Sequence, residues 1–275
     1  MSEAESLIRL KCPLCGKPLI KNDGSYCCDN NHSFDIARQG YVNLLPVQDK
    51  HSLNPGDTKE MLAARRRFLD SGSYEPICAD TSECIKRFVN AERPIVADVG
   101  CGEGYYTNRI SSFCGAVCAG IDISKDGVRY ACSRNRDILW LVATASRLPL
   151  YDESVDAVIA MFSLLMPEEY RRVLKKGGII VEVTVGNDHL KELKSIIYDE
   201  VFQQSKHPAE AGEGLCELMC EERRFEITLD NSKLKDLLLM TPHFWRIKQS
   251  RRELLESTEE LTLTVHYWIR VLKKI

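Results

Sequence analysis

Long apolar runs are absent from the sequence: no stretch of about eighteen hydrophobic residues, the length that a membrane-spanning helix needs, occurs. The amino terminus, Met1–Glu5, is acidic and lacks the basic and then apolar order of a secretory signal peptide. Internal repeats and low-complexity tracts are also missing. These absences argue against a membrane-spanning or secreted protein and predict a globular protein that resides in the cytoplasm, without membrane association.

An excess of charge of one sign is also absent, since the formal net charge is −3 in a chain of 275 residues. This balance argues against a general nucleic-acid coat and leaves open RNA binding through a local basic patch. A chain of this length buries a sizeable core without covalent staples. The 12 cysteines are not spaced as a disulfide framework, and those near the amino terminus have metal-ligand spacing, which favours a reducing compartment.

The first candidate functional group is this cluster of thiols with one imidazole. Cys12 and Cys15 form one pair, and Cys28 and His32 form a second pair. Sulfur and nitrogen ligands in two such pairs suit a closed tetrahedral zinc site. Cys27 is an alternative to Cys28, which we prefer because its spacing to His32 lies in the usual range. The segment has few apolar residues, so a bound metal would supply stability that a core cannot.

The remainder of the chain alternates short apolar runs with helical segments. Strands are expected at Pro94–Val99, Ala116–Asp122, Ile138–Val142, Val155–Ala160 and Ile179–Thr184, and helices at Thr58–Asp70, Ile77–Val89, Tyr105–Phe113 and Glu168–Leu174. The last helix is expected to end at Gly177-Gly178, and the β-rich run Leu261–Ile269 to supply a closing antiparallel strand. This order predicts an α/β fold with a mostly parallel, doubly wound sheet.

A glycine-rich turn follows the first of these expected strands. Glycine lets the chain turn tightly and lets the backbone approach a ligand closely. A nicotinamide-binding fingerprint would need glycine where Tyr105 stands, so an adenosyl ligand without a pyrophosphate fits better. Asp122 ends the second strand, where a carboxylate can accept hydrogen bonds from both ribose hydroxyls. Against the alternative of a simple tight crossover, an S-adenosylmethionine site and a Rossmann-like class I methyltransferase are predicted from Asp98, Gly100, Gly102, Glu103, Gly104 and Asp122.

The segment after the fourth expected strand excludes two methyltransferase chemistries. Enzymes that methylate the exocyclic amine of adenine have a polar residue and two prolines there, whereas this chain has Phe162-Ser163-Leu164-Leu165. A nucleophilic cysteine in a Pro-Cys setting, which pyrimidine C5 enzymes need, is absent from the same loop. A ring nitrogen, a hydroxyl or a small molecule therefore remains as the methyl acceptor. No catalytic residue is assigned, because displacement at an activated sulfonium needs alignment above all. The segment Ala145–Leu150 is either an adenine contact or an ordinary loop.

Taken together, the motifs resemble the bacterial 23S rRNA guanine-N1 methyltransferases over nearly the whole chain. The run Gly40–Val47 is highly specific, because neither zinc knuckles nor cofactor folds require it. The other matching segments are Cys12-Pro-Leu-Cys15, Phe34-Asp35, Asn54–Asp57, Met61–Asp70, Asp98–Thr107, His189–Leu193 and Met240-Thr241-Pro242.

The resemblance implies methyl transfer to N1 of a guanine in a 23S rRNA hairpin, carried out by a homodimer whose subunits form a cleft for the RNA. It implies a zinc-binding RNA-recognition module at residues 1–45, a linker with helices at 46–92 and a methyltransferase domain at 93–275. A small-molecule methyltransferase and a non-catalytic zinc protein that binds RNA are the alternatives, and the intact glycine turn with Asp122 disfavours the second.

The resemblance also implies residue roles. The family's zinc ligands fall on Cys12, Cys15, Cys28 and His32, and its cofactor contacts on Tyr74, the Glu103-Gly104 turn and His189. Purely structural roles are the alternatives: Tyr74 as a packing aromatic, and His189 as a cap of the next helix. The arginines Arg65 to Arg67 are either a solvated helix face or phosphate contacts.

Overall fold

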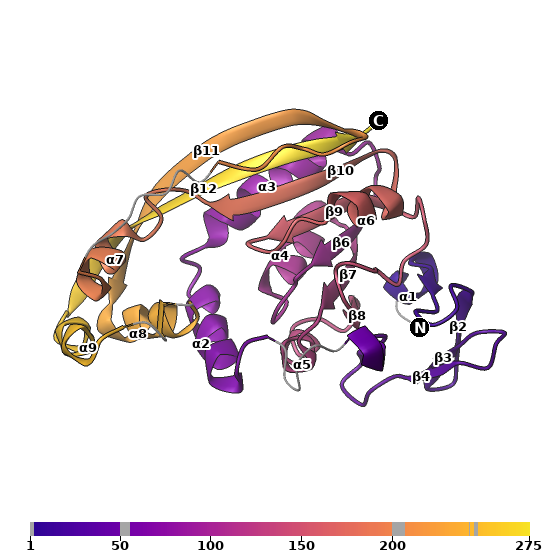
Figure 1. Cartoon of the computed structure of the whole chain (residues 1–275), viewed down its shortest axis with the longest axis horizontal. Helices are drawn as coiled ribbons and strands as arrows, with labels where there is room; N and C mark the ends of the chain where they lie inside the picture. The colour runs from indigo at the N-terminus through magenta and orange to yellow at the C-terminus, as the bar shows by residue number, and fades with distance from the viewer. Residues whose placement is uncertain (1–2, 50–55, 200–206, 242, 245–246) are drawn as a thin grey trace.

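The computed structural model describes residues 3–49, 56–199, 207–241, 243–244 and 247–275. Of the predicted segments, Asn54-Pro55 and Pro242 lie outside this part of the chain. Its body is a sheet built from β5 (Val42–Asn43), β6 (Ile95–Val99), β7 (Val117–Asp122), β8 (Leu139–Val142), β9 (Val155–Met161), β10 (Leu174–Val185), β11 (Leu215–Asp230) and β12 (Glu260–Lys274). The spatial order is β11-β12-β10-β9-β6-β7-β8-β5 (Figure 1).

The directions of these strands confirm the predicted topology. Neighbouring strands from β10 across to β5 are parallel, whereas β12 pairs antiparallel with β10 and β11 pairs antiparallel with β12. The predicted run Leu261–Ile269 lies within β12 and supplies the expected antiparallel strand. A mostly parallel sheet of this kind must be covered on both faces.

The helices follow from local capping and apolar spacing. They are α1 (Glu3–Leu7), α2 (Lys59–Asp70), α3 (Glu75–Phe88), α4 (Tyr105–Cys114), α5 (Lys125–Ala131), α6 (Pro167–Val173), α7 (Lys191–Ile197), α8 (Asn231–Leu239) and α9 (Gln249–Glu256). Thr58 begins α2 by accepting a hydrogen bond from the Met61 amide, as an N-cap residue does. Figure 1 shows α7, α8 and α9 gathered at one end of β11 and β12, far from the amino terminus.

Two buried clusters lie on the two faces of the sheet. Consecutive residues of a strand point to opposite faces, so Val96 belongs to one cluster and Ala97 to the other. The first cluster includes side chains of α2, α3, α4 and α5. The second includes α6 together with the cysteine-rich module. The module therefore covers part of one face of the sheet, and its helix α1 packs against β7.

The predicted end of the helix after β9 is wrong. Gly177-Gly178 does not end α6, which already stops at Val173. Leu174 pairs with Val155 in the sheet, and the register shifts between Leu174 and Ile179, where Gly177 has a left-handed φ of 74°. Burial of the Leu174 side chain draws the backbone into the sheet early, and the glycines form a bulge within β10.

Two strands of the sheet were not predicted. The edge strand β11 is rich in Glu and Arg and largely exposed, so it lacks the apolar run that marks a buried strand. The other, β5, is only two residues long, but it pairs with β8 and extends the opposite edge. It lies within the motif Gly40–Val47, and Val42 and Leu44 are buried in the core.

The cysteine-rich module forms its own small antiparallel sheet. Its strands are β1 (Leu10–Lys11), β2 (Pro18–Asn22), β3 (Ser25–Cys27) and β4 (Ser33–Asp35), in that order. A short 3-10 helix, Val47–Asp49, follows β5. The module lies at the amino-terminal end of the molecule, against β7 and β8 (Figure 1).

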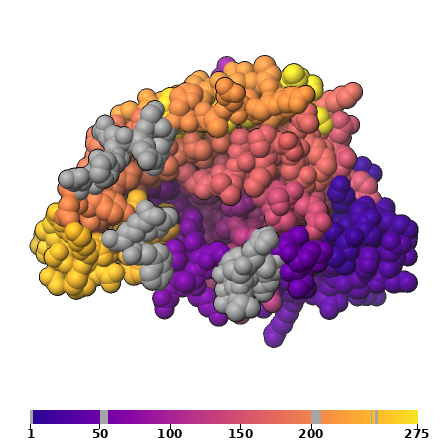
Figure 2. All heavy atoms as spheres, in the orientation of Figure 1, coloured from indigo at the N-terminus to yellow at the C-terminus, as the bar shows by residue number. Residues whose placement is uncertain are grey.

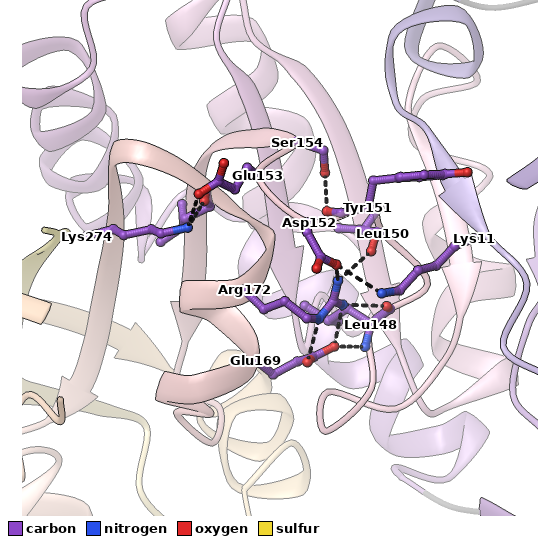
Figure 3. Close-up of polar contacts among 11 residues, drawn as sticks. Lys11, Leu148, Leu150, Tyr151, Asp152, Glu153, Ser154, Glu169, Arg172 and Lys274 are labelled. Carbon is purple, nitrogen blue, oxygen red and sulfur yellow. Dashed lines mark hydrogen bonds and ion pairs between the residues drawn. The ribbon is translucent and has the colours of Figure 1, made fainter. Parts of the chain in front are cut away.

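An ion-pair network attaches this module to the main sheet. Arg172 of α6 donates to Asp152 at 2.5 Å and to Glu169 at 2.6 Å, and it also donates to two carbonyls of the loop after β8. Lys11 of β1 reaches the same Asp152 at 3.1 Å (Figure 3). The backbone of Leu10 pairs with Leu150 in an isolated bridge. One arginine thus holds the loop on which the module rests.

The described helices include none that is long and apolar enough to cross a membrane. This agrees with the lack of a long apolar run in the sequence.

A buried ion pair generates a stability prediction for the antiparallel closure of the sheet. Arg270 and Glu182 are direct partners across β12 and β10, joined by a hydrogen bond of 2.8 Å, and both are buried. We expect Arg270→Met to lower the free energy of unfolding by about 3–5 kcal/mol, because it leaves the carboxylate without its partner. Urea unfolding measures this.

The matched control is Lys233→Met, which removes an exposed pair with Asp230 and should cost less than about 1 kcal/mol. The double variant Glu182→Leu with Arg270→Met should recover most of the free energy of unfolding that Arg270→Met loses, because no buried charge is left unpaired. A double variant that loses as much stability as the two single variants added together would contradict the explanation.

Candidate active site and metal centre

The carboxyl ends of the parallel strands border a pocket of about 600 Å³. Its walls come from the segment after β6, the ends of β7, β9 and β10, helix α2, and the residues that follow α8. Figure 2 shows the surface hollowed between α2 and the strands above it. Crevices at this end of an open α/β sheet are where ligands bind.

The predicted glycine turn forms one wall of this pocket. Gly100, Gly102 and Gly104 have φ angles of 85°, 54° and 84°, a region that other residues avoid. A Cβ on Gly100 would lie 2.6 Å from the Cβ of Ser163, and one on Gly104 would lie 2.7 Å from Trp140. Nothing described lies within 4 Å of such an atom on Gly102, so this glycine faces open space. The turn is thus closely packed against the protein at Gly100 and Gly104 and open at Gly102.

Asp122, the predicted ribose contact, holds the turn and also lines the pocket. Its Oδ2 accepts the amide of Gly102 at 2.8 Å, and its Oδ1 accepts the amide of Ser124 at 2.7 Å. Burial raises the pKa of this carboxyl, and the two amide hydrogen bonds oppose that rise. Each carboxylate oxygen keeps a second acceptor position, which suits a pair of hydroxyls.

The carboxylates of Asp98 and Glu103 are both held by partners in the fold. Asp98 is buried, accepts a hydrogen bond of 2.5 Å from Thr107, and is not among the described residues that line the pocket. Burial raises its pKa to about 7. Glu103 lines the pocket, yet its carboxylate accepts a hydrogen bond of 2.6 Å from Arg134. Both carboxylates therefore stabilise the turn and helix α4.

Tyr74 and His189 face each other across the pocket's other side, with ring centroids 6.3 Å apart. Tyr74 is buried against Phe68, and burial raises its pKa. The Nδ1 atom of His189 accepts the amide of His266 at 3.4 Å, which leaves Nε2 as the nitrogen that carries a proton. Leu190, and not His189, is the N-cap residue of helix α7.

Several other residues line the pocket although the sequence assigned them no role, among them Asp57, Tyr106, Ser163 and His243. Arg65 enters the pocket and donates to Asp57 at 2.5 Å and to the carbonyl of Met240 at 3.2 Å. Its neighbours hold α2 in place instead, since Arg66 donates to Ser133 and Arg67 to Asp236. Only tertiary contacts reveal this division, because the three arginines are consecutive.

The segment Ala145–Leu150 contributes no described residue to the pocket. Leu148 and Leu150 are buried in the second core cluster, and the Leu148 amide donates to Glu169 at 2.5 Å. This favours the ordinary-loop alternative over an adenine contact.

The predicted metal ligands come together in the small sheet. One ligand atom from each of Cys12, Cys15, Cys28 and His32 lies within 4.8 Å of every other. The Sγ atoms of Cys15 and Cys28 are 3.7 Å apart, and the Nδ1 of His32 is 3.4 Å from the Sγ atoms of Cys12 and Cys28. A tetrahedron with zinc–sulfur bonds of about 2.3 Å has edges of about 3.8 Å, so the donor set fits zinc.

Cys27, the alternative ligand, lies outside this cluster. Its Sγ is 3.4 Å from the hydroxyl of Ser33 and 3.5 Å from that of Ser25. Cys28, the residue directly after β3, instead has its Sγ 3.7 Å from that of Cys15 and 3.4 Å from the Nδ1 of His32. The described geometry selects Cys28.

Comparison with known proteins first defines the class. Residues 10–53 match the zinc-ribbon family profile described as RlmA, N-terminal, and residues 97–181 match a profile described as methyltransferase domain. A provisionally named methyltransferase (BH2331) from Bacillus halodurans has the same fold, with a TM-score of 0.50 at 15% identity over 71% of this chain and 99% of its own. The chain is a class I S-adenosylmethionine-dependent methyltransferase with an added zinc ribbon, so its cofactors are S-adenosylmethionine and zinc.

Two relatives then define the family. The 23S rRNA (guanine(748)-N(1))-methyltransferase of Streptomyces fradiae is 34% identical over 272 residues, which cover 94% of this chain and 95% of the relative. YxjB of Bacillus subtilis, provisionally named a 23S rRNA (guanine-N(1)-)-methyltransferase, is 31% identical over 267 residues, 93% of each chain. The chain belongs to the 23S rRNA guanine-N1 methyltransferase family, which confirms the resemblance found in the sequence.

The geometry at Asp122 generates a binding prediction. Asp122→Asn keeps one acceptor oxygen and replaces the other with a donor, so it cannot accept from both ribose hydroxyls. Hydrogen bonds to a charged group contribute about 1.5–3 kcal/mol, which corresponds to a roughly ten- to hundredfold weaker affinity for S-adenosylmethionine. Calorimetry measures the Kd. Asp126→Asn in α5, outside the pocket lining, is the control and should bind normally; equal affinities in both variants would contradict the assignment.

The adjacent cysteines offer a matched pair for the metal centre. Cys28→Ser should lose zinc and lower the melting temperature, because the small sheet loses the bonds that hold its strands together. Cys27→Ser should retain the metal. Elemental analysis of the purified variants measures zinc per chain. Loss of zinc from Cys27→Ser with retention in Cys28→Ser would reverse the assignment.

Proposed function

We propose that this chain transfers the methyl group of S-adenosylmethionine to N1 of a guanine in a hairpin of 23S ribosomal RNA. The observation that carries the proposal is the similarity to relatives named for this reaction, which extends through both the zinc ribbon and the methyltransferase domain. The pocket supports it, since about 600 Å³ lies within the range of small-molecule sites.

The described residues divide the work of holding the cofactor. We assign the adenosyl part to Gly100, Gly102 and the carboxylate of Asp122, because an open backbone and two acceptor oxygens lie there. The methionine part is assigned to the side of Tyr74 and His189, where the Nε2–H of His189 is a suitable donor to a carboxylate. Asp98 acts as a positioning residue behind the turn, and Glu103, which lines the pocket, is held by Arg134. Cys12, Cys15, Cys28 and His32 are the proposed zinc ligands.

S-adenosylmethionine supplies a methyl group that is already activated by its sulfonium. In the transfer, N1 forms a bond to the methyl carbon, the carbon–sulfur bond breaks with its electron pair left on sulfur, and the N1 proton is released to water. The chain's own residues mainly hold the base and the cofactor in line. Because N1 lies on the pairing edge inside a duplex, the guanine must leave its stack to reach the pocket.

The zinc ribbon is proposed to help hold the RNA hairpin. Lys17 and Arg38 are exposed on the module and suit phosphate contacts, which position an RNA without reading its sequence. The contacts of Lys11 and Leu10 with the loop between β8 and β9 support a set orientation of the module to the pocket. We further propose a cytoplasmic homodimer whose subunits together form the RNA cleft; light scattering of the purified protein measures the oligomeric state.

Transfer of tritium from labelled cofactor to 23S rRNA that lacks the modification tests the proposal. We expect incorporation into the RNA and a reverse-transcription stop immediately before one guanine of a hairpin, because a methyl group on N1 blocks pairing. Label that requires a small molecule instead of RNA, or that resides on another guanine atom, would refute it. The intact chain is needed, since Val42 and Leu44 near the end of the module are buried in the main core.

A further inference from the structure

Phe162, the first residue after β9, adopts a backbone conformation that a bulky side chain rarely takes. Its φ is 54°, and it is the only aromatic among the described non-glycine residues with positive φ. Its ring lines the pocket and remains 36% exposed. A non-glycine residue in the left-handed region costs free energy, and such residues persist at functional sites when the surroundings impose them.

The contacts around Phe162 do impose this conformation. Its amide donates to the carbonyl of Val183 in β10 at 2.8 Å. The hydroxyl of the next residue, Ser163, donates to the carbonyl of Val99 at the end of β6, also at 2.8 Å. Gly100 has no Cβ, which leaves room for Ser163 directly beside the turn. The end of β9 is thus pinned from both sides, and the Phe162 ring is held in the pocket wall.

Two other rings stand beside it. The ring centroid of Phe162 lies 6.2 Å from that of Tyr106 and 6.4 Å from that of His189, with the Phe162 and His189 planes inclined by 33°. The three side chains form an aromatic wall next to the glycine turn and opposite α2. A flat aromatic surface that is partly exposed inside a pocket suits stacking of a planar base.

We propose that Phe162 is the stacking face for the guanine that is extruded from the RNA, and that it positions N1 for methyl transfer. This inference rests on the proposed function, which supplies the guanine. Stacking on a ring face leaves all edges of the base free, so N1 can point toward the cofactor while the ring sets the plane of the base. The strain at Phe162 is the consequence of placing a large ring where the backbone turns.

Phe162→Gly separates this role from a structural one. Glycine adopts a φ of 54° without strain, and this gain offsets the lost ring contacts and the greater freedom of the unfolded chain, so the unfolding midpoint should stay close to that of the wild type. The kcat/KM for the RNA should fall by roughly 5- to 150-fold, the equivalent of one base–aromatic stack. The calorimetric Kd for S-adenosylmethionine should stay unchanged. Phe162→Tyr keeps a ring and should retain activity.

Glu153→Gly is the matched control, because Glu153 also has a positive φ, of 51°, but lies outside the pocket lining. It should methylate RNA at the wild-type rate. Wild-type kcat/KM in Phe162→Gly, an equal loss in Phe162→Tyr, or a loss that accompanies weaker cofactor binding or a markedly lower unfolding midpoint would each overturn the inference. Failure of the proposed function is distinct, since the wild-type protein would then methylate no guanine N1.

Discussion

The site depends on one constraint: the chain must turn sharply after β6 with no side chains in the way. Gly100 and Gly104 are packed so closely that a Cβ on either would overlap Ser163 or Trp140. Asp122 secures the front of the turn through the Gly102 amide, and Asp98 secures the back through Thr107. The same packing brings the end of β9 against the turn. The position of the glycine turn therefore also fixes the position of the aromatic wall that contains Phe162.

The zinc ribbon depends for its stability on a metal and on contacts with the methyltransferase domain. A segment with so few apolar residues cannot form a core of its own, and a metal held by four side chains compensates for that. It is nevertheless not an independent appendage, since β5 joins the main sheet and Arg172 with Asp152 ties β1 to α6. An RNA bound to the ribbon would therefore meet the pocket at a defined distance and angle.

Most of the α/β order could be predicted, because buried parallel strands appear as short apolar runs between helical segments. The exposed strand β11 could not, since its many charged residues hide its pairing with β12. The Gly177-Gly178 pair looked like a helix end, yet a glycine pair indicates a change of direction without saying in which element it lies. Asp98 was predicted among the cofactor contacts, and its burial behind the turn became visible only once Thr107 was placed beside it.

By itself, the sequence determined the chemistry: the glycine turn with Asp122 indicated the adenosyl cofactor, the cysteine spacing indicated zinc, and the motif Gly40–Val47 indicated the family. These are local features, in which the order of residue types carries the information. The tertiary structure alone decided which of two adjacent cysteines faces the metal, which of three consecutive arginines enters the pocket, and that Phe162 is strained and exposed there. Those properties depend on contacts between residues far apart in the chain, so no local pattern encodes them.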